Sequence, residues 1–211
     1  MSDQKIFSLR LNGKFAFIQE YFKHPLQIAS IIPSSRFLER RIVMASGISS
    51  SKIAVELGPG TGGTTRALLS AMPHGAKLLC IEMNPHFHEL VSSIKDARLI
   101  VHLGNACDLR EILSMYNLDA PKVVISGIPF STMSPILGSQ IIDAISSSLA
   151  PNGRFVAYQF SSKVSILCRP FLGSAQTEME LLNIPPMRIY QWEKNGNQYQ
   201  VFGVNRPQVY L

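Results

Sequence analysis

The sequence predicts an α/β protein with a Rossmann-like, doubly wound and mostly parallel sheet of seven strands. We expect this sheet to end in an antiparallel hairpin and to be preceded by an N-terminal helical extension. Three observations predict the fold. Short apolar runs alternate with helical stretches between residues 53 and 160. A glycine-rich turn follows the first run, and an Asn-Gly pair at 195–196 marks a hairpin.

Five apolar runs are expected to form the parallel strands, over residues 53–57, 77–81, 99–103, 122–126 and 154–160. Helices are expected between them, over residues 64–72, 85–94, 109–116 and 137–149. The last two strands, 187–193 and 198–205, flank the Asn-Gly pair. Alternating strands and helices of this kind predict helices on both faces of the sheet.

The composition excludes several classes of protein. Apolar residues make up 46% of the 211 residues and charged residues 16%, which permits a sizeable core and excludes a disordered chain. No apolar run approaches the roughly 20 residues that cross a bilayer. The first residues lack the apolar stretch of a secretion signal, so we expect the protein in the cytoplasm. The three cysteines have no CxxC spacing, and we therefore expect free thiols and no metal site.

The first 48 residues are expected to form a basic, aromatic extension, and residues 49–211 the α/β domain. Residues 1–52 hold eight basic and three acidic side chains, whereas the rest of the chain is nearly neutral. Phe15, Ile18 and Phe22 share one face of a predicted helix. This pattern favours an anionic partner, either a membrane surface or a nucleic acid. A solvated helix or a lid over a ligand site is the alternative.

The glycine-rich turn follows the first strand and opens a helix, which is the context of a nucleotide-binding loop. Its residues are Glu56, Gly58, Pro59, Gly60, Thr61 and Gly62. The spacing fits both GxGxG and, with Gly63, the GxGxxG pattern of dinucleotide sites. The Glu56 carboxylate would repel a pyrophosphate and attract a cation. S-adenosylmethionine carries a sulfonium and an ammonium and no phosphate, so the turn favours that cofactor over NAD.

Two further positions extend the expected cofactor site. Glu82 ends the second strand, 20 residues beyond Gly62, where a carboxylate can accept both hydroxyls of a ribose. Met83 follows it and is assigned to the same site. Asn105 and Ala106 follow the third strand, where the asparagine could contact adenine. A plain turn asparagine is the alternative.

With these motifs the sequence resembles class I S-adenosylmethionine-dependent methyltransferases. Within that class it is similar to the bacterial phospholipid N-methyltransferases and the ornithine-lipid N-methyltransferases. Three segments carry the resemblance: Pro33-Ser34-Ser35, the glycine-rich turn, and Ser126-Gly127-Ile128-Pro129-Phe130. The chain departs from these relatives at Asn105, where they commonly carry aspartate, and at Ser162, where they tend towards tyrosine.

The resemblance implies methyl transfer to the amine of a membrane lipid head group, such as phosphatidylethanolamine, with S-adenosylhomocysteine as product. It also implies peripheral attachment at the inner face of the membrane, whose anionic surface would be a partner. The residues expected to orient the amine are Ser126, Gly127, Ile128 and Pro129. Ser126, Ser34 and Ser35 are also expected to contact the cofactor. Tyr21 and Tyr158 are candidate proton acceptors or orienting groups. The alternative for Tyr158 is a core residue of its strand.

Three alternatives remain at this point. Ribosomal-RNA adenine methyltransferases share the glycine-rich turn and hold a flipped base with an Asn-Leu-Pro-Tyr motif. Gly127 stands where that asparagine would be, so we expect no nucleic-acid partner. A methyltransferase of small molecules is the second alternative, and a catalytically silent, cofactor-binding membrane module is the third.

Overall fold

A computed structural model describes residues 35–183 and 185–194 of the chain. The chain divides into two units, residues 1–33 and residues 34–211. The predicted aromatic helix with Tyr21, the residue Ser34 and the predicted strand 198–205 lie outside the described residues. In the part that is described, no helix is both long and apolar enough to cross a membrane.

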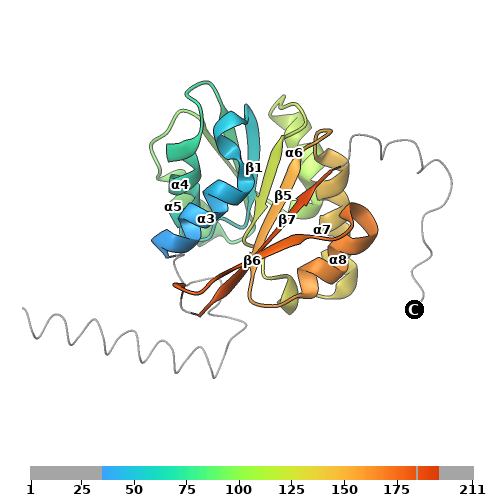
Figure 1. Cartoon of the computed structure of the whole chain (residues 1–211). Coiled ribbons are helices and arrows are strands. Elements are labelled where there is room, and N and C mark those ends of the chain that lie inside the picture. The colour runs from blue at the N-terminus through green and yellow to red at the C-terminus, as the bar shows by residue number, and fades with distance from the viewer. Residues whose placement is uncertain (1–34, 184, 195–211) are drawn as a thin grey trace, which may run out of the picture. The chain divides into compact units, whose positions relative to one another are not determined.

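The second unit contains a seven-stranded sheet in the order β3-β2-β1-β4-β5-β7-β6 (Figure 1). Its strands are β1 (Ile53–Leu57), β2 (Lys77–Glu82), β3 (Leu99–Leu103), β4 (Val123–Ser126), β5 (Arg154–Gln159), β6 (Gln176–Glu180) and β7 (Met187–Glu193). Strands β1 to β5 are parallel, β7 is antiparallel to β5, and β6 is antiparallel to β7. The predicted fold class is therefore confirmed.

The closing hairpin differs from the predicted one. Strand β7 pairs with β5 along one edge and with β6 along the other. Because β6 occupies the second edge of β7 over residues 187–191, the prediction that the whole of 187–193 pairs with residues 198–205 is wrong. Strand β6 escaped prediction because four of its five residues are exposed and its sequence, Gln-Thr-Glu-Met-Glu, lacks an apolar alternation.

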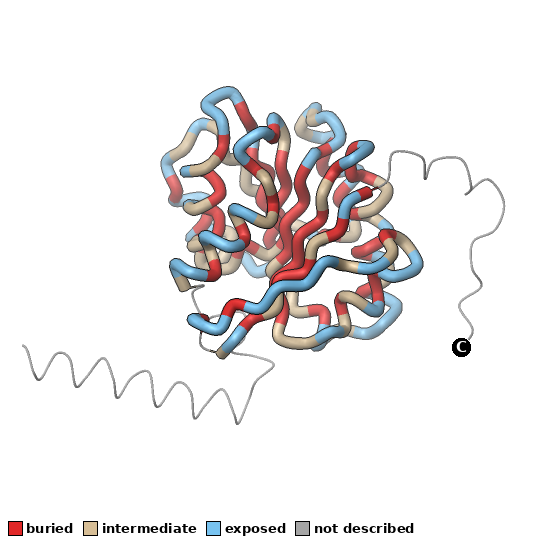
Figure 2. The backbone as a smooth tube through the Cα atoms, in the orientation of Figure 1, coloured by how far each residue is buried: buried red, intermediate tan, exposed pale blue. Residues whose placement is uncertain are grey.

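Among the described residues, six α-helices cover the sheet, three on each face (Figure 1). They are α3 (Arg36–Ser46), α4 (Gly63–Ala71), α5 (Pro85–Ser92), α6 (Leu109–Met115), α7 (Pro135–Ser148) and α8 (Lys163–Leu172). Helices α3, α4 and α5 share one core with alternate strand residues, and α6, α7 and α8 share the other. The central strands are accordingly buried on both faces, as Figure 2 shows.

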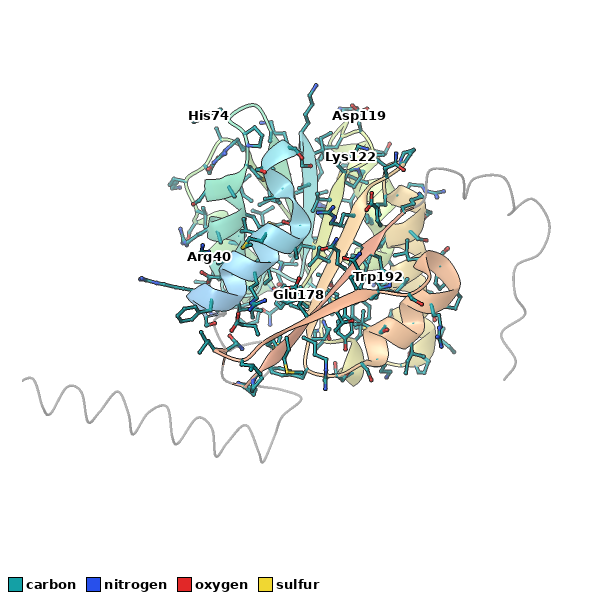
Figure 3. The ribbon with its side chains drawn as sticks, in the orientation of Figure 1. Arg40, His74, Asp119, Lys122, Glu178 and Trp192 are labelled. Carbon is teal, nitrogen blue, oxygen red and sulfur yellow. The ribbon has the colours of Figure 1, made fainter. Side chains whose placement is uncertain are left out.

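Helix α3 packs on the sheet, although we expected its sequence to belong to the extension. The Ser35 hydroxyl caps the helix by accepting the N–H of Leu38 at 3.2 Å. The guanidinium of Arg41 binds two carboxylates of β6, Glu180 at 2.6 Å and Glu178 at 3.0 Å. Glu178 is labelled in Figure 3, where β6 passes beside α3. These contacts fix the middle of α3 beside β6.

Candidate functional site

The candidate site lies where strand order reverses, between β1 and β4. Chain order proceeds from β1 through β2 to β3 on one side and from β4 to β5 on the other, so ligands are expected at the carboxyl ends of β1 and β4. Leu57 and Ser126 end these strands side by side. The N–H of Gly127 donates to the Leu57 carbonyl at 2.9 Å. A Cβ on Gly58 would lie 3.1 Å from Cγ1 of Ile128. The two predicted motifs therefore form one site.

The backbone of the turn requires glycine at three positions. Gly58, Gly60 and Gly62 have φ angles of +69°, +56° and +80°, in the left-handed region that other residues rarely adopt. Gly63 has no such angle and is the first residue of α4. The left-handed positions thus follow the GxGxG spacing, the one that favoured S-adenosylmethionine.

Glu56 is fully buried in β1, on the face covered by α3, α4 and α5. One carboxylate oxygen accepts the Thr65 hydroxyl at 2.6 Å and the Cys80 thiol at 3.4 Å. Among the described residues, the other oxygen has no hydrogen-bond partner. Burial raises the pKa of Glu56 to about 7. An orphaned carboxylate oxygen beneath the turn is a group that a cation would stabilise.

Glu82 connects the second strand to the glycine-rich turn. Its carboxylate accepts the N–H of Gly60 at 3.2 Å and the N–H of Asn84 at 2.9 Å. Its backbone carbonyl accepts the N–H of Gly104 at 3.0 Å. Glu82 thus lies within reach of the expected ligand, while the side chain of Met83 is exposed.

Asn105 makes the contacts of a turn residue. Its side-chain oxygen accepts the N–H of Cys107 at 3.0 Å and caps the short helix Ala106–Asp108. This is the alternative that the sequence left open. The residue still lies at the carboxyl end of β3, and its neighbour Ala106 is buried.

The segment after β4 is stabilised by hydrogen bonds of its own. The hydroxyl of the buried residue Ser126 accepts the N–H of Ile128 at 3.2 Å. The carbonyl of Ile128 accepts the side-chain amide of Gln159 at 2.6 Å. The carbonyl of Pro129 accepts both the N–H and the hydroxyl of Thr132. The carbonyls of Ile128 and Pro129 thus already have donors, so groups other than these two must be considered for orienting an amine.

Tyr158, a candidate orienting group in the sequence, reaches this site from β5, and it is also buried as a core residue would be. Its hydroxyl lies against Gly127, where an added Cβ would contact it, and it shares a hydrogen bond with Thr64. Burial raises the pKa of the Tyr158 phenol well above its usual value, so the group stays protonated at neutral pH. The pairing of Ser126 with Ala157 places Tyr158 one residue beyond the end of β4. This strand register brings Tyr158 to the same edge of the sheet as Gly127.

Ser35 and the residue types that could bind a metal were also considered in the sequence, and the structure shows their surroundings. Ser35 caps α3, and its N–H donates to the Asn183 side chain at 3.0 Å. Throughout the described ranges, no group of histidine, cysteine or acidic residues could hold a metal ion. In the same part of the chain the three cysteines are free, with Cys80 and Cys168 buried and Cys107 half-buried.

Solved structures share this fold. N-methyltransferase NodS from Bradyrhizobium japonicum WM9 is 10% identical with a TM-score of 0.61, over 74% of this chain and 94% of NodS. Human N-acetylserotonin methyltransferase, solved with S-adenosylmethionine, is 13% identical with a TM-score of 0.58, over 74% of this chain and 51% of that one. No family model matches the chain. The fold is that of the class I S-adenosylmethionine-dependent methyltransferases.

The sequence is also similar to known methyltransferases, over different shares of its length. The ornithine lipid N-methyltransferase of Singulisphaera acidiphila is 28% identical over 179 residues, which cover 83% of this chain and 93% of the relative. Ribosomal RNA small subunit methyltransferase A of Maricaulis maris is 33% identical over 103 residues, 47% of this chain and 35% of that enzyme. Together with the fold, these likenesses confirm the predicted class: the chain is a methyltransferase with S-adenosylmethionine as its cofactor.

Proposed function

We propose that this protein transfers methyl groups to the amine of a membrane lipid head group, such as phosphatidylethanolamine or an ornithine lipid. The observation that carries the proposal is the extent of the alignments. Similarity to the ornithine lipid enzyme covers 83% of the chain, including the segment after β4, whereas similarity to the ribosomal RNA enzyme of Maricaulis maris covers 47%. The proposal includes peripheral attachment to the anionic inner face of the membrane through the basic residues of the N-terminal extension.

The packing around Gly127 supports a lipid amine over an adenine base. A Cβ at this position would lie 2.8 Å from Cζ of Tyr158 and 2.9 Å from the Gly58 carbonyl oxygen. An asparagine that grips a flipped base therefore has no room here. A primary amine requires less space than a base, and the phenol of Tyr158 offers it an oxygen.

The turn residues fit the cofactor in shape and charge. We assign Glu56, Gly58, Pro59, Gly60, Thr61 and Gly62 to its binding, together with Glu82, Met83, Asn105, Ala106, Ser126, Ser34 and Ser35. The left-handed glycines present no side chains to a ligand, and the orphaned oxygen of Glu56 matches a cationic group. When bound, the cofactor supplies an electrophilic methyl group on its sulfonium.

The protein must also present the amine without its proton. A lipid ammonium titrates near ~10 in water, and burial beside a cation lowers its pKa. The phenol of Tyr158 is protonated at neutral pH and so cannot accept that proton, which we assign to solvent. Its oxygen can accept an N–H of the neutral amine and direct the lone pair at the methyl group. Positioning of this kind supplies up to ~7–11 kcal/mol in favourable cases. Tyr21 remains a second candidate for this role.

The proposal is tested by offering several acceptors to the purified protein with methyl-labelled cofactor. The acceptors are anionic vesicles containing phosphatidylethanolamine, anionic vesicles containing ornithine lipid, and unmodified ribosomal RNA. We expect label in a lipid amine and none in RNA. Label in RNA alone would overturn the proposal. Cofactor binding without label in any acceptor would favour the catalytically silent module.

A matched variant controls for background label. Gly60→Val places a branched side chain at a φ of +56°, beside the N–H that Glu82 accepts. It should lose cofactor binding and all transfer. Val43→Gly makes the opposite substitution at a half-buried position of α3 away from the site. This variant should retain cofactor binding and methyl transfer.

A further inference from the structure

Exposed apolar side chains gather at the edge of the sheet that carries the site. We call the following six residues the apolar rim: Phe37, Ile136, Leu137, Ile166, Leu181 and Leu182. Each lies in the first turn of α3, α7 or α8 or directly after β6. Helices α7 and α8 follow β4 and β5, and β6 runs parallel to β5, so these positions share the carboxyl edge.

Hydrogen bonds connect the elements of the rim. The N–H of Ser35 donates to Asn183 at 3.0 Å, which places the start of α3 beside the turn between β6 and β7. The ammonium of Lys163 donates to the Met133 carbonyl at 2.7 Å, which connects the start of α8 to the segment before α7. The apolar rim therefore belongs to the folded domain, and these hydrogen bonds hold its elements at the carboxyl edge of the sheet, where the site lies.

The charges around the rim are those that an anionic surface attracts. Residues 127–137 and 181–187 contain no charged side chain. Arg36 and Arg40 are exposed on α3 beside Phe37, and Arg40 is labelled in Figure 3. Glu178, on the neighbouring strand, is already paired with Arg41. Apolar side chains bordered by arginines are typical of surfaces that insert shallowly into an anionic bilayer.

We propose that the apolar rim docks on an anionic lipid bilayer and that Leu181 and Leu182 insert between its head groups. The inference rests on the proposed function, because a head-group amine reaches the carboxyl edge only if that edge faces the membrane. It assigns membrane contact to the folded domain itself, in addition to the extension. Docking by the rim would bring the site to the amine without withdrawing the lipid from the bilayer.

The first test compares the full-length protein with two double variants. Leu181→Ser/Leu182→Ser removes two adjacent rim residues, which are 67% and 62% exposed. Met44→Ser/Met115→Ser removes equally exposed side chains, 70% and 65%, from the ends of α3 and α6 at the opposite edge. We expect the rim variant to partition about tenfold less onto vesicles of phosphatidylglycerol and phosphatidylethanolamine, with the methionine variant unchanged.

A second test locates the contact directly. Leu182→Trp and Met115→Trp are each compared with wild type on vesicles of brominated lipid. The natural Trp192 is 1% exposed and stacks on Phe155, so it contributes a constant background. Quenching of Leu182→Trp alone supports docking by the rim. This readout also applies if the serine variant fails to fold.

The outcomes separate this inference from the proposed function. Unchanged partitioning of the rim variant, with no quenching of Leu182→Trp, would overturn the inference, and it is also the result expected if residues 1–33 cover the rim. An equal loss in the methionine variant would overturn it as well. Rim-dependent binding by a protein that labels no lipid amine would contradict the proposed function alone.

Discussion

The hydroxyl of Tyr158 lies against Gly127, where the parallel strands β4 and β5 end side by side. This contact leaves no space for a side chain at position 127. A Cβ added there would also lie 2.9 Å from the carbonyl oxygen of Gly58. Gly127 therefore lies between Gly58, which we assign to cofactor binding, and Tyr158, which we propose orients the acceptor amine. Small changes at either residue should therefore affect both stability and binding.

Gly127→Ala should lower the free energy of unfolding by roughly 1–3 kcal/mol, because the new methyl group overpacks this contact. Tyr158→Phe removes the hydroxyl that the methyl group would meet first. The double variant should therefore recover part of the loss, although Cζ of the ring remains. Urea unfolding of the four proteins gives the coupling energy. Strict additivity would show that the two residues do not interact.

Glu56→Gln should change stability in a pH-dependent way. The folded pKa of about 7 lies above the unfolded value of 4.5. Between these values the unfolded chain loses a proton that the folded protein keeps, so wild-type stability falls as pH rises through this window. The glutamine variant lacks this fall. Its stability relative to wild type should rise between pH 5 and pH 8 by on the order of 3 kcal/mol. An identical difference in urea unfolding at both pH values would contradict the assignment.

The affinity for the cofactor should depend on the ionisation of Glu56. A cation binds the ionised form of Glu56 more tightly, so affinity for S-adenosylmethionine should increase as pH rises through about 7. Calorimetry from pH 6 to pH 8.5 gives the affinities of wild type and Glu56→Gln. In their ratio the ionisation of the cofactor itself cancels, because it affects both proteins equally. A constant ratio would mean that Glu56 does not sense the cofactor's charge.

Glu82→Ala should weaken binding of S-adenosylhomocysteine by roughly 10- to 100-fold, because a charge-assisted pair of hydrogen bonds to ribose is lost. The fold should persist, since the Gly60 and Asn84 N–H groups it leaves can turn to water at the site edge. Glu89→Ala, exposed on α5, is the matched control and should bind normally. Full affinity in the Glu82 variant would refute the ribose assignment.

Lys194→Met should destabilise the domain without affecting the site. The buried ammonium of Lys194 donates to the carbonyls of Ser146 and Leu149 at 2.5 and 2.7 Å, at the end of α7. Their loss should cost roughly 1.5–3 kcal/mol of unfolding free energy. Lys122→Met offers a control, because Lys122 makes one exposed bond, to Pro151, at the edge opposite the site (Figure 3). Equal effects of the two changes would show that burial of Lys194 contributes nothing.

Local patterns predicted the elements that are buried on both faces. The run 53–57 predicted β1 with its observed bounds, and the other parallel strands lie within two residues of expectation, including the less buried edge strand β3. Such strands are continuous apolar runs, which a sequence displays directly. Strand β6 has exposed, polar residues and depends on β7 and on Arg41 for its place. Helix α8 was not expected either, since Ser161-Ser162 precede it and Pro170 lies inside it.

The sequence by itself determined the parallel α/β framework, the turn with its three glycines and the carboxylates of Glu56 and Glu82, because each depends on residues close in the chain. Tertiary structure alone decided which atoms are already bonded and which remain for a ligand. It placed the Tyr158 hydroxyl against Gly127, gave the Ile128 carbonyl to Gln159, and left one oxygen of Glu56 without a partner among the described residues. These outcomes depend on strand register and on packing between distant segments, which local periodicity does not encode.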